Sequence, residues 1–259
     1  MKGKTALITG SSGGLGYAVA EGLAGAGCNI VLHGLEPAAD MESQRSELER
    51  RHGVKALYLQ ADLADPAAIE SMIGQARDGL GPVDILVNNA VVRNFGRVEE
   101  FPVDAWNMAL AVNLSAAFHA IRLTLPGMRQ RGWGRIFNMT SVYGFRATPN
   151  RIDYVTTKTA LIGMTRAVAL ENVTGGITCN AICPGAVYTP GSEVRVERMM
   201  AEQNIDRDTA MRRFMVGKQP SGRFVEPQDV AAMVVFLCGP ASRDITGAVL
   251  PVEGGWLAS

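Results

Sequence analysis

Tyr154 and Lys158 are the two residues of this chain whose types and spacing point most directly to chemistry. They stand at positions i and i+4 of a predicted helix, so their side chains share one face. A free tyrosine has a pKa of about 10 and is a weak base near neutral pH. A neighbouring ammonium group favours the phenolate and lowers that pKa. The pair therefore predicts a tyrosine that exchanges a proton with a substrate oxygen.

Ser141 lies thirteen residues before the tyrosine, just beyond an apolar run over 135–139 that predicts a strand. Ligands of open α/β sheets bind outside the C-terminal ends of the strands, so its hydroxyl can hydrogen-bond a substrate oxygen there. A Y-x-x-x-K spacing taken alone also fits an ordinary pair on a helix surface. The serine, together with a glycine-rich turn near the start of the chain, favours the catalytic interpretation.

That turn has glycines at positions 10, 13, 14 and 16, after an apolar run and before a helical pattern. Glycine permits a tight turn and a close backbone approach, and the free N–H groups at a helix start bind phosphate. The spacing differs from the usual G-x-G-x-x-G fingerprint. The order of strand, turn and helix nevertheless predicts a dinucleotide-binding site.

The second predicted strand ends at residues 33–36 (HGLE), where an acidic residue typically binds the ribose 2′-hydroxyl and an arginine a 2′-phosphate. No lysine or arginine occurs between Lys4 and Arg45. We therefore expect NAD rather than NADP, with Glu36 as the displaced acid and His33 near the ribose.

Apolar runs alternate with helical patterns along the whole chain, which predicts one α/β domain over residues 1–259. Its architecture is a Rossmann-type, doubly wound parallel sheet of about seven strands. A charged, methionine-bearing insertion over 190–220 predicts a helical lid. The strands are expected over 5–9, 29–33, 56–60, 83–87, 135–139, 177–182 and 248–252, and the other helices over 14–26, 40–52, 65–79, 103–130, 153–172 and 227–238.

The composition argues against several function classes. Lys+Arg and Asp+Glu both total 25, and no basic stripe indicates nucleic acid. Residues 105–121 carry no charge but are short for a membrane span, so we expect a helix buried on nearly all sides and bent near Pro126. No metal site is predicted. The cysteines form no C-x-x-C pair and predict buried free thiols in a reducing, cytoplasmic compartment: Cys28, Cys179, Cys183 and Cys238.

The chain resembles the short-chain dehydrogenase/reductase family over essentially its whole length. The resemblance rests on the glycine turn, Asn113, Ser141, the Y-x-x-x-K pair, and the segments 62–63 (DL), 88–90 (NNA) and 184–189 (PGAVYT). It implies Tyr154 as acid/base, Ser141 as substrate polariser, Lys158 on the nicotinamide ribose, and Asn113 holding a water that relays protons. The family's N-N-A-G is N-N-A-V here. Val91 either crowds the cofactor or is accommodated by ordinary backbone angles.

The resemblance also implies the cofactor contacts. Adenine lies against residues 62–63, the adenosine ribose beside 89–90, and the nicotinamide under 184–189. A homotetramer is implied as well, and the apolar surfaces of the helices over 103–130 and 153–172 favour one independently. The predicted cofactor set is Gly10, Ser12, Gly14, Leu15, Gly16, His33, Asp62, Leu63, Asn89, Ala90, Tyr154, Lys158, Pro184, Gly185, Val187 and Thr189.

Several stretches look like the D-3-hydroxybutyrate dehydrogenases of that family, among them 98–106, 114–136 and 252–258. The positions that hold the substrate carboxylate there correspond to Arg93, Tyr143, Arg151 and Arg195, and a bulky tryptophan corresponds to Ala186. Only the charge at Arg151 is kept. Arginine binds carboxylate with two hydrogen bonds. The sequence thus predicts a carboxylate-bearing substrate, with Ser141 and Tyr154 completing the site, that is larger than 3-hydroxybutyrate or carries a second carboxylate.

The sequence leaves alternatives open for two arginines, the lid methionines and the activity. Arg93 and Arg195 could point to solvent, as most charged residues do. The lid methionines could contact substrate or form the core between the lid helices. The activity could be that of a general carbonyl or 3-oxoacyl reductase, or the protein could be a weakly active dinucleotide-binding module. The lid methionines are Met199, Met200, Met211 and Met215.

Overall fold

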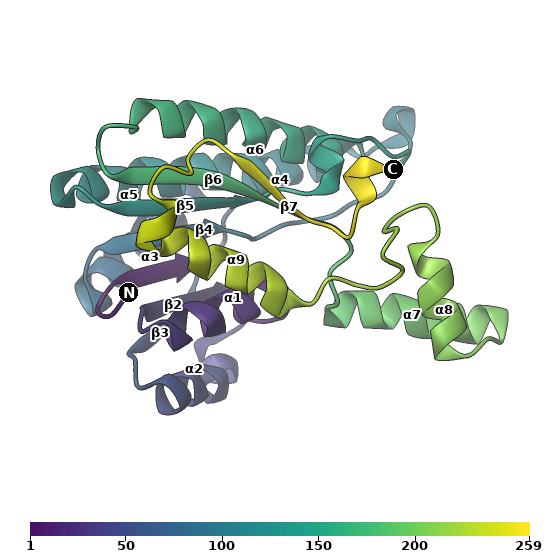
Figure 1. Cartoon of the computed structure of the whole chain (residues 1–259), viewed down its shortest axis with the longest axis horizontal. Coiled ribbons are helices and arrows are strands. Elements are labelled where there is room, and N and C mark those ends of the chain that lie inside the picture. Colours follow the sequence, from purple (N-terminus) through teal and green to yellow (C-terminus); the bar gives the residue numbers. More distant parts are fainter.

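Seven parallel strands form a single sheet in the order β3-β2-β1-β4-β5-β6-β7 in the computed structural model, which describes residues 1–259 (Figure 1). Consecutive strands are joined across the sheet by helical connections, and the order reverses direction at β1. The prediction of a doubly wound parallel sheet is confirmed. The strands are β1 (Thr5–Ile8), β2 (Asn29–Gly34), β3 (Ala56–Gln60), β4 (Val83–Asn88), β5 (Gly134–Met139), β6 (Ile177–Pro184) and β7 (Val249–Val252).

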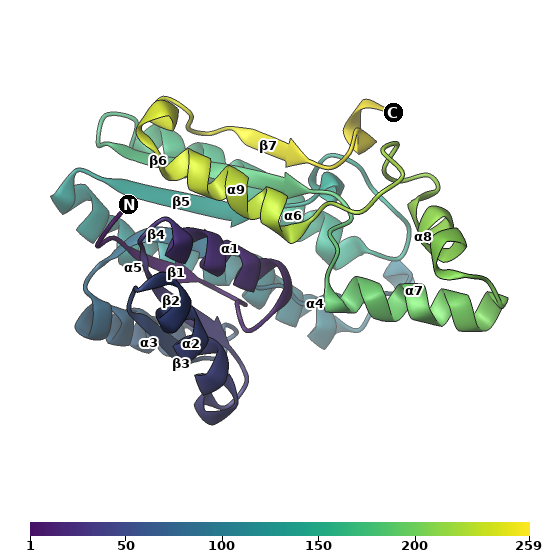
Figure 2. The same cartoon turned by 60° about the horizontal axis from the view of Figure 1, so that its bottom comes forward.

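Helices cover both faces of the sheet. One face packs against α1 (Gly14–Gly25), α2 (Ala38–His52) and α9 (Pro227–Cys238), with α1 and α9 in front of the strands in Figure 2. The other face packs against α3 (Pro66–Leu80), α5 (Ala116–Arg131) and α6 (Ile152–Glu171). Successive residues of a strand point to opposite faces, so neighbouring β1 residues belong to different cores. This explains why the strands read as continuous apolar runs.

The helix predicted over 103–130 is divided in the structure. α4 (Val103–Leu110) and α5 are separated by a π-helical turn, Ala111–Ser115, so the predicted irregularity near Pro126 is misplaced. The cause is Asn113, whose Oδ1 accepts a hydrogen bond from the Val92 N–H at 2.8 Å and whose Nδ2 donates to the Val92 carbonyl at 3.0 Å. Such a π-helical bulge often marks a functional position.

Nor is this helix buried on nearly all sides. The continuous helical stretch Val103–Arg131 meets the length and composition of a membrane span, yet 44% of its most apolar window is buried inside the protein. The buried side packs against the sheet, and Phe118 on the other side is half exposed. The predicted core helix therefore has one free apolar face. The four cysteines, by contrast, are free and buried as predicted.

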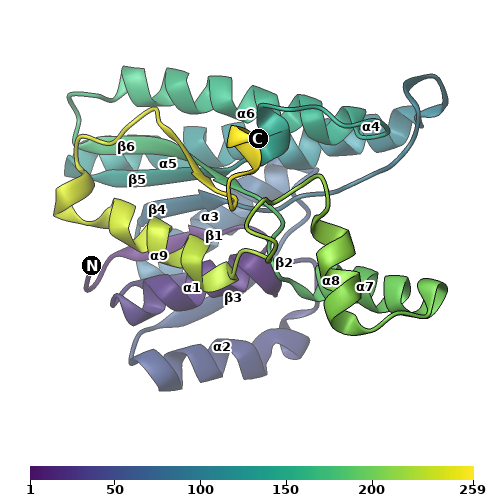
Figure 3. The same ribbon diagram turned by 45° about the vertical axis from the view of Figure 1, so that its right-hand side comes forward.

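The insertion folds as two helices, α7 (Pro190–Gln203) and α8 (Arg207–Met215), which stand apart from the sheet (Figures 1 and 3). A capping box between Thr189 and Ser192 begins α7, and α8 is tied to it because Arg207 donates to both carboxylate oxygens of Glu193. The four lid methionines pack in a small core with Val196 and Phe224, and none of them lines the central cavity. The structure therefore supports the interpretation in which these methionines form the core between the lid helices.

Candidate active site

A cavity of about 900 Å³ extends from the glycine turn to the lid, along the C-terminal ends of the central strands. This is where open α/β sheets bind ligands. All the predicted catalytic, cofactor and substrate residues line it except two: Gly14, whose neighbour Gly13 lines it instead, and the catalytic candidate Asn113, which lines a second, smaller cavity. The cavity therefore brings together residues that are spread over nearly the whole chain.

The glycine turn is shaped to receive phosphate. α1 begins on it with no side-chain cap and no acidic residue in its first turn, so the N–H groups there remain free. Gly10 has a φ of +62°, and a Cβ on Gly16 would collide with the Gly10 carbonyl oxygen. Asn89 holds the turn by donating to the carbonyls of Thr9 and Gly10 at 2.9 and 2.8 Å. The residues present thus fit a dinucleotide pyrophosphate.

His33 braces this turn, a role that its position near the ribose did not predict. Its Nδ1 accepts from the Gly10 N–H at 2.9 Å, and its Nε2 lies 3.1 Å from the Ala61 carbonyl oxygen. Nε2 therefore carries the proton and the ring is neutral. Burial lowers the pKa of His33, which favours that neutral form.

Glu36 is fixed beyond the end of β2. Its carboxylate accepts hydrogen bonds from the Ser12 hydroxyl at 3.0 Å and the Tyr58 hydroxyl at 3.3 Å. Hydrogen bonds, its own backbone N–H first, hold the pKa of Glu36 below its usual value, so it is an anion at neutral pH. Arg45, the next basic residue along the chain, is paired with two glutamates of its own helix. This end of the cavity therefore carries a negative charge and no lysine or arginine.

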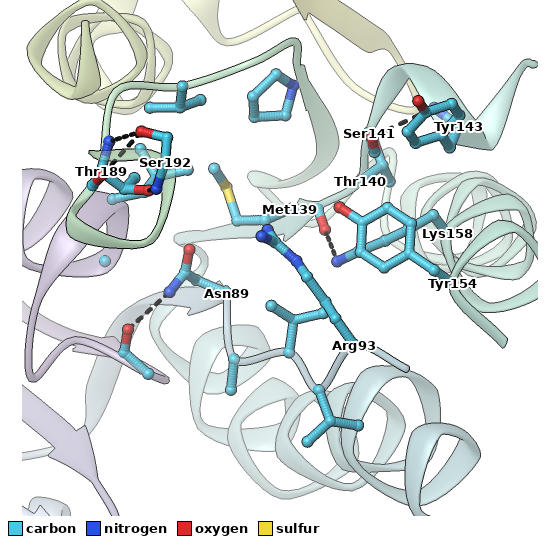
Figure 4. Close-up of a pocket in the computed structure, with 18 of the residues that line it drawn as sticks. Asn89, Arg93, Met139, Thr140, Ser141, Tyr143, Tyr154, Lys158, Thr189 and Ser192 are labelled. Atoms are coloured by element: carbon cyan, nitrogen blue, oxygen red, sulfur yellow. Dashed lines mark hydrogen bonds between the residues drawn. The ribbon is translucent and has the colours of Figure 1, made fainter. Parts of the chain in front are cut away.

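Ser141, Tyr154 and Lys158 converge in the middle of the cavity, Ser141 from the end of β5 and the others from α6 (Figure 4). All three are buried. Lys158 Nζ donates to the Met139 carbonyl at 2.6 Å, which holds the ammonium beside the tyrosine. The Ser141 hydroxyl accepts from the Tyr143 N–H at 3.3 Å and so begins the short turn Val142–Gly144.

The surroundings of Tyr154 favour its ionised form. Burial alone would raise the pKa of Tyr154, but the charges of Lys158, Arg93 and Arg151 and a hydrogen bond with Ser141 outweigh it, so the pKa lies below its ordinary value. Burial also lowers the pKa of Lys158, against which the phenolate charge acts. The arrangement can accept or donate a proton near neutral pH.

Asn113 and Lys158 line a second, smaller cavity directly behind the first. It measures about 10 Å³, close to the space that one water needs. The Asn113 amide also donates to the Thr157 hydroxyl at 3.4 Å, in addition to its two bonds with Val92. Asn113 thus fixes the loop after β4 as well as bordering the lysine.

Arg93 and Arg151 lie at the catalytic tyrosine. Their guanidinium carbons are 5.5 and 4.6 Å from the centre of the Tyr154 ring. Arg93 reaches from its loop across the cavity toward Met139 (Figure 4). Arg93 and Arg195 keep much of their surface accessible to water, but both line the cavity. The two side chains thus face the space that the lid covers.

Sequence reasoning missed other residues at this end. Lys218 follows α8 and lines the cavity, with its Nζ 3.7 Å from the centre of the Phe214 ring. Trp256, near the C-terminus, packs edge-on against Tyr143 with ring centres 5.5 Å apart. Neither belongs to a motif of fixed spacing; Lys218 lies in the predicted lid and Trp256 in the stretch 252–258, and only their basic or aromatic character could have marked them within those segments.

Two of the departures from the family pattern, Val91 and Ala186, are accommodated. Val91 lines the cavity and has no positive φ, so its backbone angles suit valine, as one of the two interpretations held. Ala186 lines the cavity where the look-alike group has a tryptophan. The smaller side chain leaves room beside the lid.

Comparisons with known proteins agree with this geometry. The family model described as enoyl-(acyl carrier protein) reductase matches residues 10–257. D-beta-hydroxybutyrate dehydrogenases from Cupriavidus necator (strain H16) and Rhizobium meliloti (strain 1021) are 40% and 39% identical to this chain, covering 100% and 98% of it and 99% of each relative. The crystal structure of L-sorbose reductase from Gluconobacter frateurii, complexed with NADPH and L-sorbose, superposes with a TM-score of 0.94 at 30% identity, covering 100% of this chain and 98% of that one. Because these matches span the sheet, the glycine turn and the lid alike, the chain belongs to the short-chain dehydrogenase/reductase family of oxidoreductases.

Proposed function

We propose that this protein uses NAD to interconvert a secondary alcohol and a ketone on a carboxylate-bearing substrate of the 3-hydroxy acid type, larger than 3-hydroxybutyrate. The observation that carries the proposal is the position of Arg93 and Arg151 within 5.5 Å of the Tyr154 ring centre. Guanidinium groups there can hold a carboxylate close to the reacting carbon. The relatives named D-beta-hydroxybutyrate dehydrogenases support the acid class, and Ala186 supports the larger size.

In the oxidation direction, the Tyr154 phenolate accepts the hydroxyl proton of the substrate while the C–O bond becomes a carbonyl and a hydride leaves the same carbon. NAD, when bound, supplies the nicotinamide ring that accepts this hydride. The Ser141 hydroxyl donates a hydrogen bond to the reacting oxygen, and Lys158 stabilises the phenolate. In the reduction direction the tyrosine hydroxyl returns the proton.

Lys158 and Asn113 supply the route by which the proton reaches solvent. Both border the cavity of about 10 Å³ behind the tyrosine. A water molecule in this cavity, between the Lys158 ammonium and the Asn113 backbone, completes a hydrogen-bonded chain that leads away from the substrate. This assignment follows the resemblance to the family and the shared lining of the small cavity.

The proposed preference for NAD rests on Glu36. Its fixed carboxylate can accept a hydrogen bond from a ribose hydroxyl, whereas a 2′-phosphate would meet like charge and no basic side chain. Structures of the same fold have been solved with NADPH, as with the actinorhodin polyketide ketoreductase, so the fold alone does not decide the cofactor.

We further propose a homotetramer. Large apolar side chains remain exposed on two different faces: Phe118 on α5 is 50% exposed, and Phe236 on α9 is 51% exposed. Each face can pair with its copy across a twofold axis, and two such axes generate a tetramer. Light scattering at micromolar concentration should give four times the chain mass of 27.6 kDa. A monomeric mass would contradict the assignment.

The experiment for the activity follows nicotinamide reduction with NAD and NADP over a panel of 3-hydroxy acids, their methyl esters and neutral secondary alcohols of matched size. We expect the longer acids with NAD to give the highest kcat/KM. If neutral alcohols react best, the protein is a general carbonyl reductase. Tight NAD binding without turnover of any compound would indicate a dinucleotide-binding module.

A further inference from the structure

The loop that carries Arg93 is fastened to the start of α6 by a fully buried acid, Asp153. One carboxylate oxygen of Asp153 accepts from the Asn94 N–H at 3.2 Å and from the Asn94 side chain at 3.0 Å. The other oxygen accepts from the Tyr154 N–H at 2.6 Å. The residue after Arg93 and the catalytic tyrosine are therefore held by the same carboxylate.

Arg151 is held against the same loop. Gly96 N–H donates to the Asn150 carbonyl at 3.2 Å, and Asn150 adopts the left-handed conformation with a φ of +63°. Beyond this turn the Arg151 guanidinium lies between two aromatic rings, 4.3 Å from the centre of Phe95 and 4.6 Å from that of Tyr154. Its Nε is buried and has no hydrogen-bond partner. A buried donor without a partner is unfavourable, and the guanidinium to which it belongs lines the cavity.

We call Arg93 and Arg151 the floor pair, and two cations of the lid, Arg195 and Lys218, the lid pair. Arg195 projects from α7, and Lys218 follows α8 and lies over the ring of Phe214. Desolvation, followed by repulsion from Arg93, lowers the pKa of Arg195, and desolvation followed by repulsion from Arg195 lowers that of Lys218. The charges of the two pairs therefore repel one another across the cavity.

Asp153 is the one acid beside the floor pair, but it is fully buried, its carboxylate is already bound by Asn94 and the Tyr154 N–H, and it does not line the cavity. The acids that line the cavity are Glu36 and Asp62, both at the predicted adenosine end. The ion pairs of the structure all involve other residues. The remaining walls at this end are largely apolar and include Phe95, Phe214 and Phe224. One carboxylate can satisfy the floor pair, but it leaves the lid pair without an anion.

We infer that this site binds a dianion, with one carboxylate on the floor pair beside Tyr154 and a second acidic group, carboxylate or phosphoryl, on the lid pair. The two groups are joined by a hydrocarbon segment that packs on the apolar walls. The inference rests on the proposed function and names its substrate class. The second acidic group would bind directly to the lid, because the lid carries both cations of the lid pair.

Calorimetric binding in the presence of NAD tests the inference without requiring turnover. The probes are unbranched dicarboxylates from succinate to pimelate, monocarboxylates of the same carbon number, and ω-phosphonocarboxylates of the same lengths. The best dianion should bind about tenfold to a hundredfold more tightly than its matched monoanion, the range expected for one added charge-assisted contact. A phosphonate that surpasses every dicarboxylate would identify the second group as phosphoryl. Equal affinities for monoanions and dianions would overturn the inference.

Variants locate the second group. Arg195→Met and Lys218→Met should each remove most of the dianion's advantage while changing monocarboxylate affinity by less than about twofold. Arg212→Met is the matched control, since Arg212 is an exposed cation of α8 that does not line the cavity, and it should behave like the wild type. Circular dichroism of each variant reports folding.

Two further results separate the possible failures. Loss of NAD affinity in the lid-pair variants, with the dianion's advantage retained, would assign these cations to the cofactor and overturn the inference. If dianions bind as expected but no hydroxy acid of either charge is oxidised, the proposed function fails and the assignment of the binding site stands.

Discussion

The two ends of the cavity are built in opposite ways. At the cofactor end, which comprises the glycine turn and Glu36, groups of the chain hold the binding residues in place: the Gly10 N–H is bound by His33, and the Glu36 carboxylate by two hydroxyls. At the substrate end the floor pair and the lid pair have no carboxylate partner, and the Arg151 Nε has no hydrogen-bond partner at all.

The difference shows where each end obtains its specificity. The cofactor end is complete before the ligand arrives, so a substitution there disturbs the fold and the turn together. The substrate end concentrates like charges that only an anion relieves, so a substitution there should alter affinity with little effect on stability. Buried, unpaired charge is costly to a fold unless a ligand satisfies it.

Tyr154→Phe should produce the largest effect, at the boundary between the two ends. It removes the hydroxyl that transfers the proton and keeps the ring that Arg93 and Arg151 face. General acid/base catalysis contributes about 10²–10⁴ in rate, so kcat should fall by that factor. The Kd for NAD, measured by fluorescence titration, should stay unchanged. Retention of half the wild-type rate would show that another group transfers the proton.

Arg151→Met should come next, with an effect on the substrate and not on the cofactor. The KM for a carboxylate substrate should rise about tenfold to a hundredfold, and that for its methyl ester far less. Because the Arg151 charge lowers the pKa of Tyr154, its removal should also move the rise of the oxidation rate to higher pH. Arg97→Met is the control, since Arg97 pairs with Glu99 outside the cavity. Equal effects on acid and ester would contradict a carboxylate contact.

The sequence predicted the position and shape of the glycine turn, because that turn is set by backbone conformation. A tight turn before a helix requires glycine at positions such as Gly16, and the glycines can be recognised from the sequence alone. The helices and strands were equally visible through their periodicity, and their ends agree with the structure to within two residues. The helix predicted from residue 65 is capped in the structure by Asp65, whose side chain accepts from the Ala67 N–H at 2.9 Å.

The sequence did not predict the remaining features, because contacts between residues far apart in the chain produce them. The break in the long helix comes from hydrogen bonds between Asn113 and Val92, while Pro126, the local signal, sits inside a continuous helix. Lys218 reaches the cavity only because the chain folds back after α8. His33 acts through Gly10 and Ala61, and no sequence pattern links those three positions.

Glu36→Gln should change the cofactor preference by a smaller amount. Glutamine can keep a hydrogen bond from Ser12 but has no charge to repel a 2′-phosphate. A unit charge about 4 Å away is worth about 1 kcal/mol at the dielectric constant of water, so the ratio of kcat/KM for NADP over NAD should rise at least about fivefold. Glu47→Gln removes the same charge from α2 at a position outside the cavity, and should leave the ratio unchanged. An unchanged ratio in both variants would mean that Glu36 does not read the ribose.

The smallest expected effect is a pH dependence of stability from His33. Its folded-state pKa is lowered by burial, and a second proton on the ring would face the Gly10 N–H donor. The unfolded chain, with a histidine pKa of about 6.5, therefore binds the proton first. The stabilisation is complete above about pH 6.5 and is lost as the pH falls from there toward the folded-state pKa.

Urea unfolding between about pH 7.5 and pH 5.5 measures this loss, compared with His33→Asn, whose amide oxygen can accept from Gly10 but does not titrate. The variant should be less stable near pH 7.5, by about 1 kcal/mol for the missing bond to Ala61. It should nevertheless lose less stability on acidification. Carboxylates whose pKa values are lowered, such as Glu36, titrate below this window, and the other histidines are common to both proteins. Parallel pH profiles would show that the His33 ring is not held neutral at the turn. The hydrogen bonds of His33 would then stabilise the cofactor end less than their geometry indicates.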